Sequence, residues 1–460
     1  MHRFNTRWGR SALFLAAVAL FIGVFHPPFF NFDTYDYMMR GFYPSAYGAH
    51  PFLFGYLLRA VGALSGLLYK GAFSHLFQAW QLFCIGVAVV ACLRDRKRRI
   101  DAPRGWRWLK PLLLGAATLG CLLPSLLFLA NGYVTEPTVF ALLAIGAMVF
   151  ARAHDEPRRP ALWLLFAAVC VVAYNVRYQL IALPAAAAVA VVARWARRRI
   201  DWRGCARSLV PIAGVLLLVA FSQRGLTSVL PADEFGKKTP EIFLRKSIQC
   251  TLGCSVRLFE ATCETRRGRS LLMGPCWKLT LAFESELGQV HPRFEGIAGT
   301  LRSLEPGQLF TFLTRAPVNY LRSRQKDPLE IYGYTFNGEI PWFSEHFPDV
   351  LARYGALLPP VPDRPAPAFK VLLAYLEWLY RHWGFHWLTV LALYASIVGI
   401  VVTRDPGSAC LYALTITTFF LFSYLQPQFP IRYAVHLTLP AFFAAWRDLL
   451  HPASAAANAA

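Results

Sequence analysis

Long apolar runs dominate this sequence and restrict what it can fold into. Ten of them lie near 11–28, 75–93, 111–130, 138–151, 161–175, 178–193, 208–223, 386–402, 408–425 and 433–449. A helix needs roughly 20 apolar residues to cross a bilayer, so we expect the shorter runs to extend into their flanking loops. The chain is 56% hydrophobic and only 16% charged. The sequence therefore predicts an all-α polytopic membrane protein with about ten transmembrane helices, outer juxtamembrane helices and a small extracytoplasmic domain.

Charge alternates between the loops that join these runs. Basic residues gather near 3–10, 94–110, 152–159 and 194–207, whereas the short loops between them carry only Arg40, Arg177 and Arg432. By the positive-inside rule both termini are cytoplasmic. This topology also accounts for much of the net charge of +21, so we expect membrane lipids and no nucleic acid as partners.

Three apolar segments need a different interpretation. The stretches 51–70 and 366–384 contain charged residues and are typical of amphipathic helices on the outer surface. A re-entrant hairpin remains the alternative for 51–70. The N-terminal run resembles a signal peptide, but His26-Pro27-Pro28 offers no small-residue cleavage site, so we expect it to remain as an anchor.

The chain divides into three parts. We expect residues 1–224 to form a transmembrane core of seven spans, with a first external loop at 29–74. Residues 225–370 form an extracytoplasmic soluble domain, and residues 371–460 hold a juxtamembrane helix and three C-terminal spans. The external domain contains four cysteines, for which we expect two disulfides rather than a zinc site, because paired C-x-x-C knuckles are absent: Cys250, Cys254, Cys263 and Cys276.

Acidic residues occupy the first two short loops opposite the basic ones. The first loop carries Asp33, Asp36 and Tyr37, and two carboxylates among aromatic residues suit a general base or a metal ligand. An interfacial aromatic belt would explain the tyrosine but not the two acids. The second loop carries Glu136 after Thr135. Helix capping alone would also account for Glu136.

Two Arg-Tyr pairs begin helices on the same side. They are Arg177-Tyr178 and Arg432-Tyr433. Arginine suits phosphate because its donors form a fixed fork, and a helix N-terminus adds amide groups. The alternative is arginine snorkelling to lipid headgroups. Acids for base catalysis and arginines for phosphate at one membrane face favour group transfer from a lipid-linked phosphate to an acceptor hydroxyl.

The order of these motifs resembles the GT-C superfamily of membrane glycosyltransferases, which includes protein O-mannosyltransferases, aminoarabinose transferases and arabinofuranosyltransferases. The resemblance rests on the acidic first loop, on Thr135-Glu136-Pro137, on Arg177-Tyr178 before Leu180-Ile181-Ala182-Leu183-Pro184, and on Pro430-Ile431-Arg432-Tyr433 before Leu439-Pro440. It covers mostly residues 20–195 and 420–450.

The resemblance implies a polyprenyl-phosphate sugar as donor and a glycan, lipid or protein as acceptor. Asp33 would deprotonate the acceptor hydroxyl, with Asp36 as runner-up, because the family often shows adjacent acids and this chain separates them. Glu136 would orient acceptor or base, and Arg177 and Arg432 would hold the donor phosphate. Some members use a divalent metal. This chain lacks a clear ligand cluster, so we predict no cofactor and no metal.

The expected location is the bacterial inner membrane, with the active site on the extracytoplasmic face. One competing interpretation is an O-antigen-type polymerase or ligase that uses lipid pyrophosphate donors. Another is a transporter or lipid flippase, although neither internal repeats nor broken helices at the bilayer midplane are evident. A non-enzymatic assembly subunit is the third.

Overall fold

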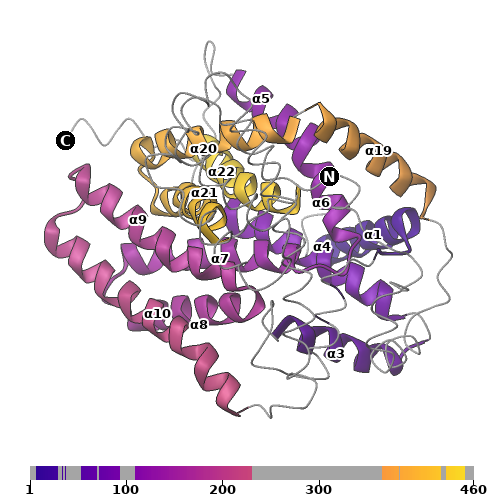
Figure 1. The fold of residues 1–460 in the computed structure, drawn as a ribbon, viewed down its shortest axis with the longest axis horizontal. Coiled ribbons are helices and arrows are strands. Elements are labelled where there is room, and N and C mark those ends of the chain that lie inside the picture. Colours follow the sequence, from indigo (N-terminus) through magenta and orange to yellow (C-terminus); the bar gives the residue numbers. More distant parts are fainter. Residues whose placement is uncertain are drawn as a thin grey trace, which may run out of the picture.

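The computed structural model describes residues 7–29, 34, 37, 53–69, 72–93, 109–229, 365–382, 384–425 and 431–450. Throughout these residues the regular structure is helical, and the β-type pairing is a single isolated bridge between Phe29 and Gly132. The helices form one packed bundle (Figure 1). The expected extracytoplasmic domain at 225–370, with its four cysteines, lies almost entirely outside the described residues.

Each of the ten expected apolar runs falls in a helix. The helices are α1 (Arg7–Phe25), α4 (Ala72–Leu93), α5 (Leu109–Ala117) continued by the π-helical turn Thr118–Leu122 into α6 (Leu123–Ala130), α7 (Glu136–Asp155), α8 (Pro160–Val176), the 3-10 turn Tyr178–Ile181 leading into α9 (Ala182–Ala196), α10 (Trp202–Val229), α20 (Gly384–Val402), α21 (Pro406–Leu425) and α22 (Ile431–Leu450).

Among the described residues, six helical segments are long and apolar enough to cross a membrane: Ala72–Leu93, Leu109–Ala130, Glu136–Asp155, Gln179–Ala196, Trp202–Ser222 and Gly384–Val402. The chain is therefore an all-α membrane protein with several such helices. α1, α8 and α21 contribute only shorter apolar segments. The number of ten crossings stays a prediction.

α7 lies at the centre of the bundle, in contact with α4, α8, α9, α21 and α22. Small residues allow this close approach. A Cβ at Gly146 would lie 2.4 Å from the Leu183 side chain of α9. Prolines at the starts of α7 and α8 suit the first turn of a helix, where no backbone donor is needed. Short turns after α6, α7, α8 and α9 then make these neighbours antiparallel.

The two ends of the bundle differ in charge. We call one the basic end, because the turns after α7 and α9 and the turn between α20 and α21 carry exposed arginines there. The opposite, far end holds the turn between α6 and α7, at residues 131–135, and the break between α8 and α9. The positive-inside rule predicts that the basic end is cytoplasmic, and this orientation stays a prediction.

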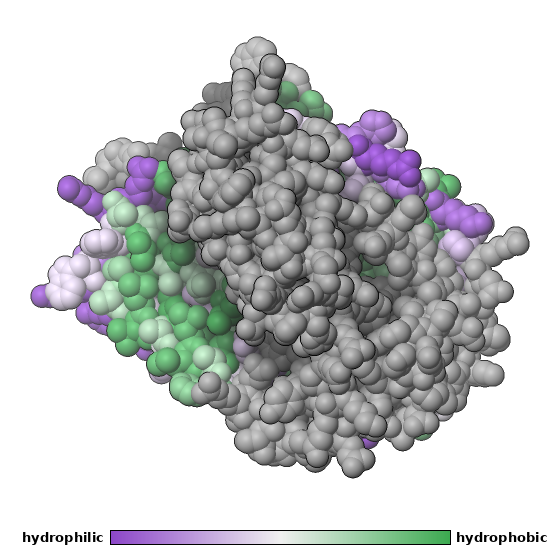
Figure 2. All heavy atoms as spheres, viewed as in Figure 1, coloured by the Kyte–Doolittle hydropathy of each residue, from purple (hydrophilic) through white to green (hydrophobic). Residues whose placement is uncertain are grey.

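The side of the bundle is hydrophobic, as a bilayer requires. Figure 2 shows mostly hydrophobic surface on the left, where Figure 1 places α8, α9 and α10. Large apolar side chains are exposed on each of these helices: Leu164, Leu165, Val189, Val192, Leu217 and Leu218. Exposed apolar surface of this extent is expected where helices contact lipid.

Both segments expected to be amphipathic are helical. α3 (Leu53–Gly66) buries Phe54 and Leu58 on one face. α19 (Pro367–Arg381) buries Phe369 and Leu376, but its Tyr375 hydroxyl donates a hydrogen bond to the Gly120 carbonyl at 2.6 Å. Gly120 lies midway along Leu109–Ala130, so α19 packs against the side of that helix. Its position relative to the outer membrane surface stays a prediction.

Candidate functional site

A bridge between two loops organises the far end. The Phe29 amide donates to the Asn131 carbonyl at 2.8 Å, and the Tyr133 amide donates back to the Phe29 carbonyl at 3.2 Å. Gly132 makes this approach possible, because a Cβ there would lie 2.4 Å from the Phe29 ring. The Phe29 ring stacks against Phe128 at 4.8 Å and against Phe369 of α19 at 5.8 Å. The chain leaving α1 is thus fixed against the loop that precedes α7.

Two buried glutamines on α4 support both segments. Gln78 donates to the Asn131 side-chain oxygen at 2.6 Å, and Gln81 donates to the Val134 carbonyl at 2.7 Å. His26, just after α1, lies 3.3 Å from the Gln78 side-chain oxygen. Buried side-chain amides that donate to a loop in this way fix the loop in one position.

The first loop reaches the second through two side chains. Thr34 donates to the Tyr133 carbonyl at 3.0 Å, and the Tyr37 hydroxyl lies 3.4 Å from the Thr135 hydroxyl. Tyr37 is 1% exposed and packs edge-on against Phe54 of α3 at 5.0 Å. Thr34 and Tyr37 of the first loop are therefore anchored on the turn that precedes α7.

A buried ion pair completes the site. The Arg177 Nη1 group donates to the Glu136 Oε1 atom at 2.7 Å and to the Thr135 hydroxyl at 2.7 Å. The two charged side chains are only 2% and 1% exposed. Glu136 is the first residue of α7, and Arg177 follows the last residue of α8. Burial this complete does not fit an arginine that snorkels to lipid headgroups.

Electrostatics make this pair matter more than a surface pair would. In a site screened from water, opposite charges attract strongly, and each ion also costs several kcal/mol to desolvate. Such a pair holds its place when further hydrogen bonds support it, as Thr135 does here. Helix capping does not fully explain Glu136. The Glu136 side chain contacts Arg177, and the Thr135 side chain makes no capping hydrogen bond to the helix.

The structure brings together three of the residues expected from the sequence: Tyr37, Glu136 and Arg177. Asp33 and Asp36 lie outside the described residues, although Thr34 and Tyr37 are their sequence neighbours. Tyr178, Arg432 and Tyr433 belong to helical turns, but their side chains are also outside the description. The convergence of the two acids with both arginines thus stays a prediction.

Metal binding is also left open. Within the described ranges no three His, Cys, Asp or Glu side chains group closely enough to hold a metal ion. Because the first-loop acids are not among those residues, metal independence stays a prediction.

Sequence reasoning missed the supporting residues Gln78 and Gln81, and it considered Thr135 as a helix cap rather than as a partner of Arg177. A signal for the glutamines was present, since both lie in one apolar run and are three residues apart, and so share a helix face. Polar side chains at membrane depth are costly and face the protein interior. Gln78 and Gln81 would therefore have pointed to a buried polar site beside α4.

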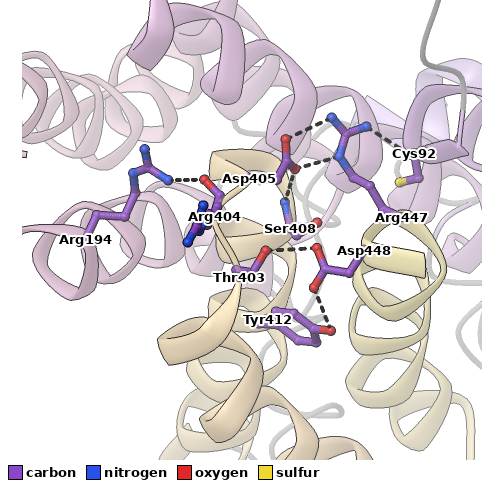
Figure 3. A network of polar contacts seen from close by, with 9 residues as sticks. All are labelled: Cys92, Arg194, Thr403, Arg404, Asp405, Ser408, Tyr412, Arg447 and Asp448. Carbon is purple, nitrogen blue, oxygen red and sulfur yellow. Dashed lines mark hydrogen bonds and ion pairs between the residues drawn. The ribbon is translucent and has the colours of Figure 1, made fainter. Parts of the chain in front are cut away.

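A second polar network lies at the basic end (Figure 3). Arg447 of α22 holds both carboxylate oxygens of Asp405, at 2.6 and 3.2 Å, and donates to the Cys92 carbonyl of α4 at 3.1 Å. Asp405 also accepts from the Ser408 amide at 2.7 Å, which caps α21. Burial would raise the pKa of Asp405, but Arg447 and Ser408 outweigh it and lower that pKa.

The other residues of this network form hydrogen bonds at the ends of helices. Asp448 accepts from Thr403 at 2.8 Å and from the Tyr412 hydroxyl at 3.2 Å. Arg194 and Arg199 of the α9 end donate to backbone carbonyls at the end of α20 and in the turn after it. Each acid of this network is held by protein donors, so the network is best understood as a lock between α4, α9, α20, α21 and α22.

Comparison with known proteins gives no further guidance. No family model matches the chain, and neither the curated proteins nor the solved structures give a significant match. The function is therefore argued from the far end itself.

Proposed function

We propose that the chain is an integral membrane glycosyltransferase that moves a monosaccharide from a polyprenyl-phosphate donor to an acceptor hydroxyl. The site would lie at the far end, on the extracytoplasmic face of a bacterial inner membrane, with both termini cytoplasmic. The supporting observation is the buried Glu136–Arg177 pair, joined through Thr135 to Tyr37 of the acidic loop. A charged pair buried at the end of a membrane-spanning bundle is costly, which makes it a candidate functional site.

The proposed reaction is a single displacement at the anomeric carbon. A first-loop carboxylate, Asp33 or Asp36, takes the proton of the acceptor hydroxyl, and the hydroxyl oxygen forms a bond to the anomeric carbon. The bond from that carbon to the phosphate oxygen breaks, and polyprenyl phosphate leaves with the electron pair. The anomeric configuration inverts.

The arginines act on the leaving phosphate. Arg177 and Arg432 supply positive charge where negative charge develops on the phosphate in the transition state. Glu136 orients the Arg177 guanidinium through the contact at 2.7 Å. Because Arg177 and Glu136 are already fixed in the protein, little reorganisation is needed when the donor binds.

The direct test incubates purified protein with a panel of radiolabelled polyprenyl-phosphate monosaccharides and measures release of polyprenyl phosphate. We expect release with one donor, and loss of turnover in Asp33→Asn or Asp36→Asn with the protein still folded. Glu156→Gln is the matched control, because Glu156 pairs with Arg159 on an exposed turn. Full transfer by Asp33→Asn, Asp36→Asn and Glu136→Gln alike would refute the proposed site.

The same variants separate an enzyme from its alternatives. A non-enzymatic subunit tolerates Asp33→Asn without loss of its role. A polymerase or ligase would release lipid pyrophosphate from a different donor, so the panel includes one pyrophosphate-linked sugar.

A further inference from the structure

A groove runs along the side of the bundle between α8 and α10, in the half nearer the basic end. Its volume is about 520 Å³, and its walls are mostly apolar, with Trp163, Leu164 and Ala167 on one side and Pro211, Gly214 and Leu218 on the other. This volume lies within the usual range for small-molecule pockets. Gly214 contributes to the hollow, because a Cβ there would meet nothing within 4 Å.

The groove faces outward rather than into the protein. Leu164 is 70% exposed and Leu218 is 51% exposed. On a chain embedded in a membrane, these residues meet lipid tails. An apolar groove open to the bilayer suits an acyl chain.

A cation lies at the basic end of this groove. Arg158, in the turn between α7 and α8, lines it and is exposed, and it forms no ion pair with any other described residue. The nearby acid Glu156 is held by Arg159 at 2.8 Å. Arg158 therefore keeps its positive charge available at the mouth.

A second arginine lies at the same level on α10. His154, in the last turn of α7, makes a buried hydrogen bond at 3.0 Å with Ser208 of α10. This contact sets residue 208 level with the turn that carries Arg158. Arg207 is exposed, pairs with no described acid, and shares a helix face with Pro211 and Gly214 by spacing.

We propose that this groove binds one anionic phospholipid, with an acyl chain between α8 and α10 and the phosphate between Arg158 and Arg207. The charge of the mouth selects an anionic headgroup over a zwitterionic one. An arginine near a membrane surface contributes about 1 kcal/mol of attraction to anionic lipid, or about fivefold in affinity. The site is distinct from the far end and does not depend on the proposed reaction.

The test reconstitutes the full chain in nanodiscs of phosphatidylcholine with a minor fraction of phosphatidylglycerol, then extracts it gently and counts retained lipids by native mass spectrometry. We expect one phosphatidylglycerol to remain on the wild-type protein. Gly214→Leu fills the groove and should abolish this retention. Arg158→Gln and Arg207→Gln should each weaken it about fivefold.

Two controls keep the test specific. Gly115→Leu places the same side chain in open space on α5, away from the groove, and Arg197→Gln removes an exposed charge at the same end of the bundle. Both should retain the lipid. Because the two arginine variants leave the packed helices untouched, they also guard against misfolding of Gly214→Leu. Equal retention of phosphatidylcholine, or unchanged retention in Gly214→Leu, would show ordinary lipid contact and overturn the proposal.

Discussion

Removing Arg177 tests whether the buried pair holds the far end together. Arg177→Met deletes the guanidinium and leaves the Glu136 carboxylate, 1% exposed, without this cation. Breaking a buried pair in this way costs about 3–5 kcal/mol. We expect that loss in the free energy of unfolding, measured by circular dichroism in mixed micelles of SDS and a mild detergent.

The matched control is Arg159→Met, which breaks an exposed pair with side chains 71% and 45% exposed. That change should cost at most about 1 kcal/mol. The double variant Glu136→Leu/Arg177→Met removes both charges and should be more stable than Arg177→Met alone, because no uncompensated charge remains. The two charges do not stabilise each other if the losses in free energy of unfolding from Glu136→Leu and Arg177→Met sum to the loss in the double variant. The same conclusion follows if Arg177→Met costs no more than the control.

Two further predictions concern other contacts. Gly132→Ala should destabilise the protein by about 1–3 kcal/mol, because its Cβ would lie 2.4 Å from the Phe29 ring; a thermal melt that matches wild type would contradict this. Acid sensitivity should come partly from Asp405, whose pKa is lowered in the folded protein by Arg447 and Ser408 against the effect of burial. The unfolded chain then binds the proton more readily, so this stabilisation is present above the ordinary carboxyl pKa and is lost as pH falls through the lowered value. Asp405→Asn should be less stable at neutral pH and flatten the acid limb of a stability profile, and an unchanged limb would exclude this role.

Hydrophobic run length predicted where the helices lie, because every run that could cross a bilayer must satisfy its backbone hydrogen bonds internally. α7 and α8 begin beside prolines and end at turns, as the sequence indicates. Run length did not predict which helix α19 packs against. Its charges favour a water interface, but the Tyr375 contact with Gly120 depends on which helix side lies next to it.

The sequence predicted that Glu136 and Arg177 belong to the site, but it did not predict that they contact each other. A lone Glu136 at a helix start and a lone Arg177 at another each had a local explanation. Their contact at 2.7 Å arises only because α7 and α8 pack side by side and the far-end turns meet. For Gln81, the sequence predicted that the residue lies in a helix. It could not predict the hydrogen bond to the Val134 carbonyl, because that bond depends on how a distant loop folds.

The half-buried Asp405–Arg447 pair and the buried Glu136–Arg177 pair show how similar chemistry serves different ends. Asp405 has both oxygens held by Arg447 and a third contact from a helix-capping amide, so its charge is fully used in joining helices. The Glu136–Arg177 pair instead joins two helix ends at the place where the acidic first loop is anchored through Tyr37. Loss of the first pair should therefore cost stability with the transfer reaction intact per folded molecule. Loss of the second, in the charge-free double variant that keeps the fold, should abolish transfer.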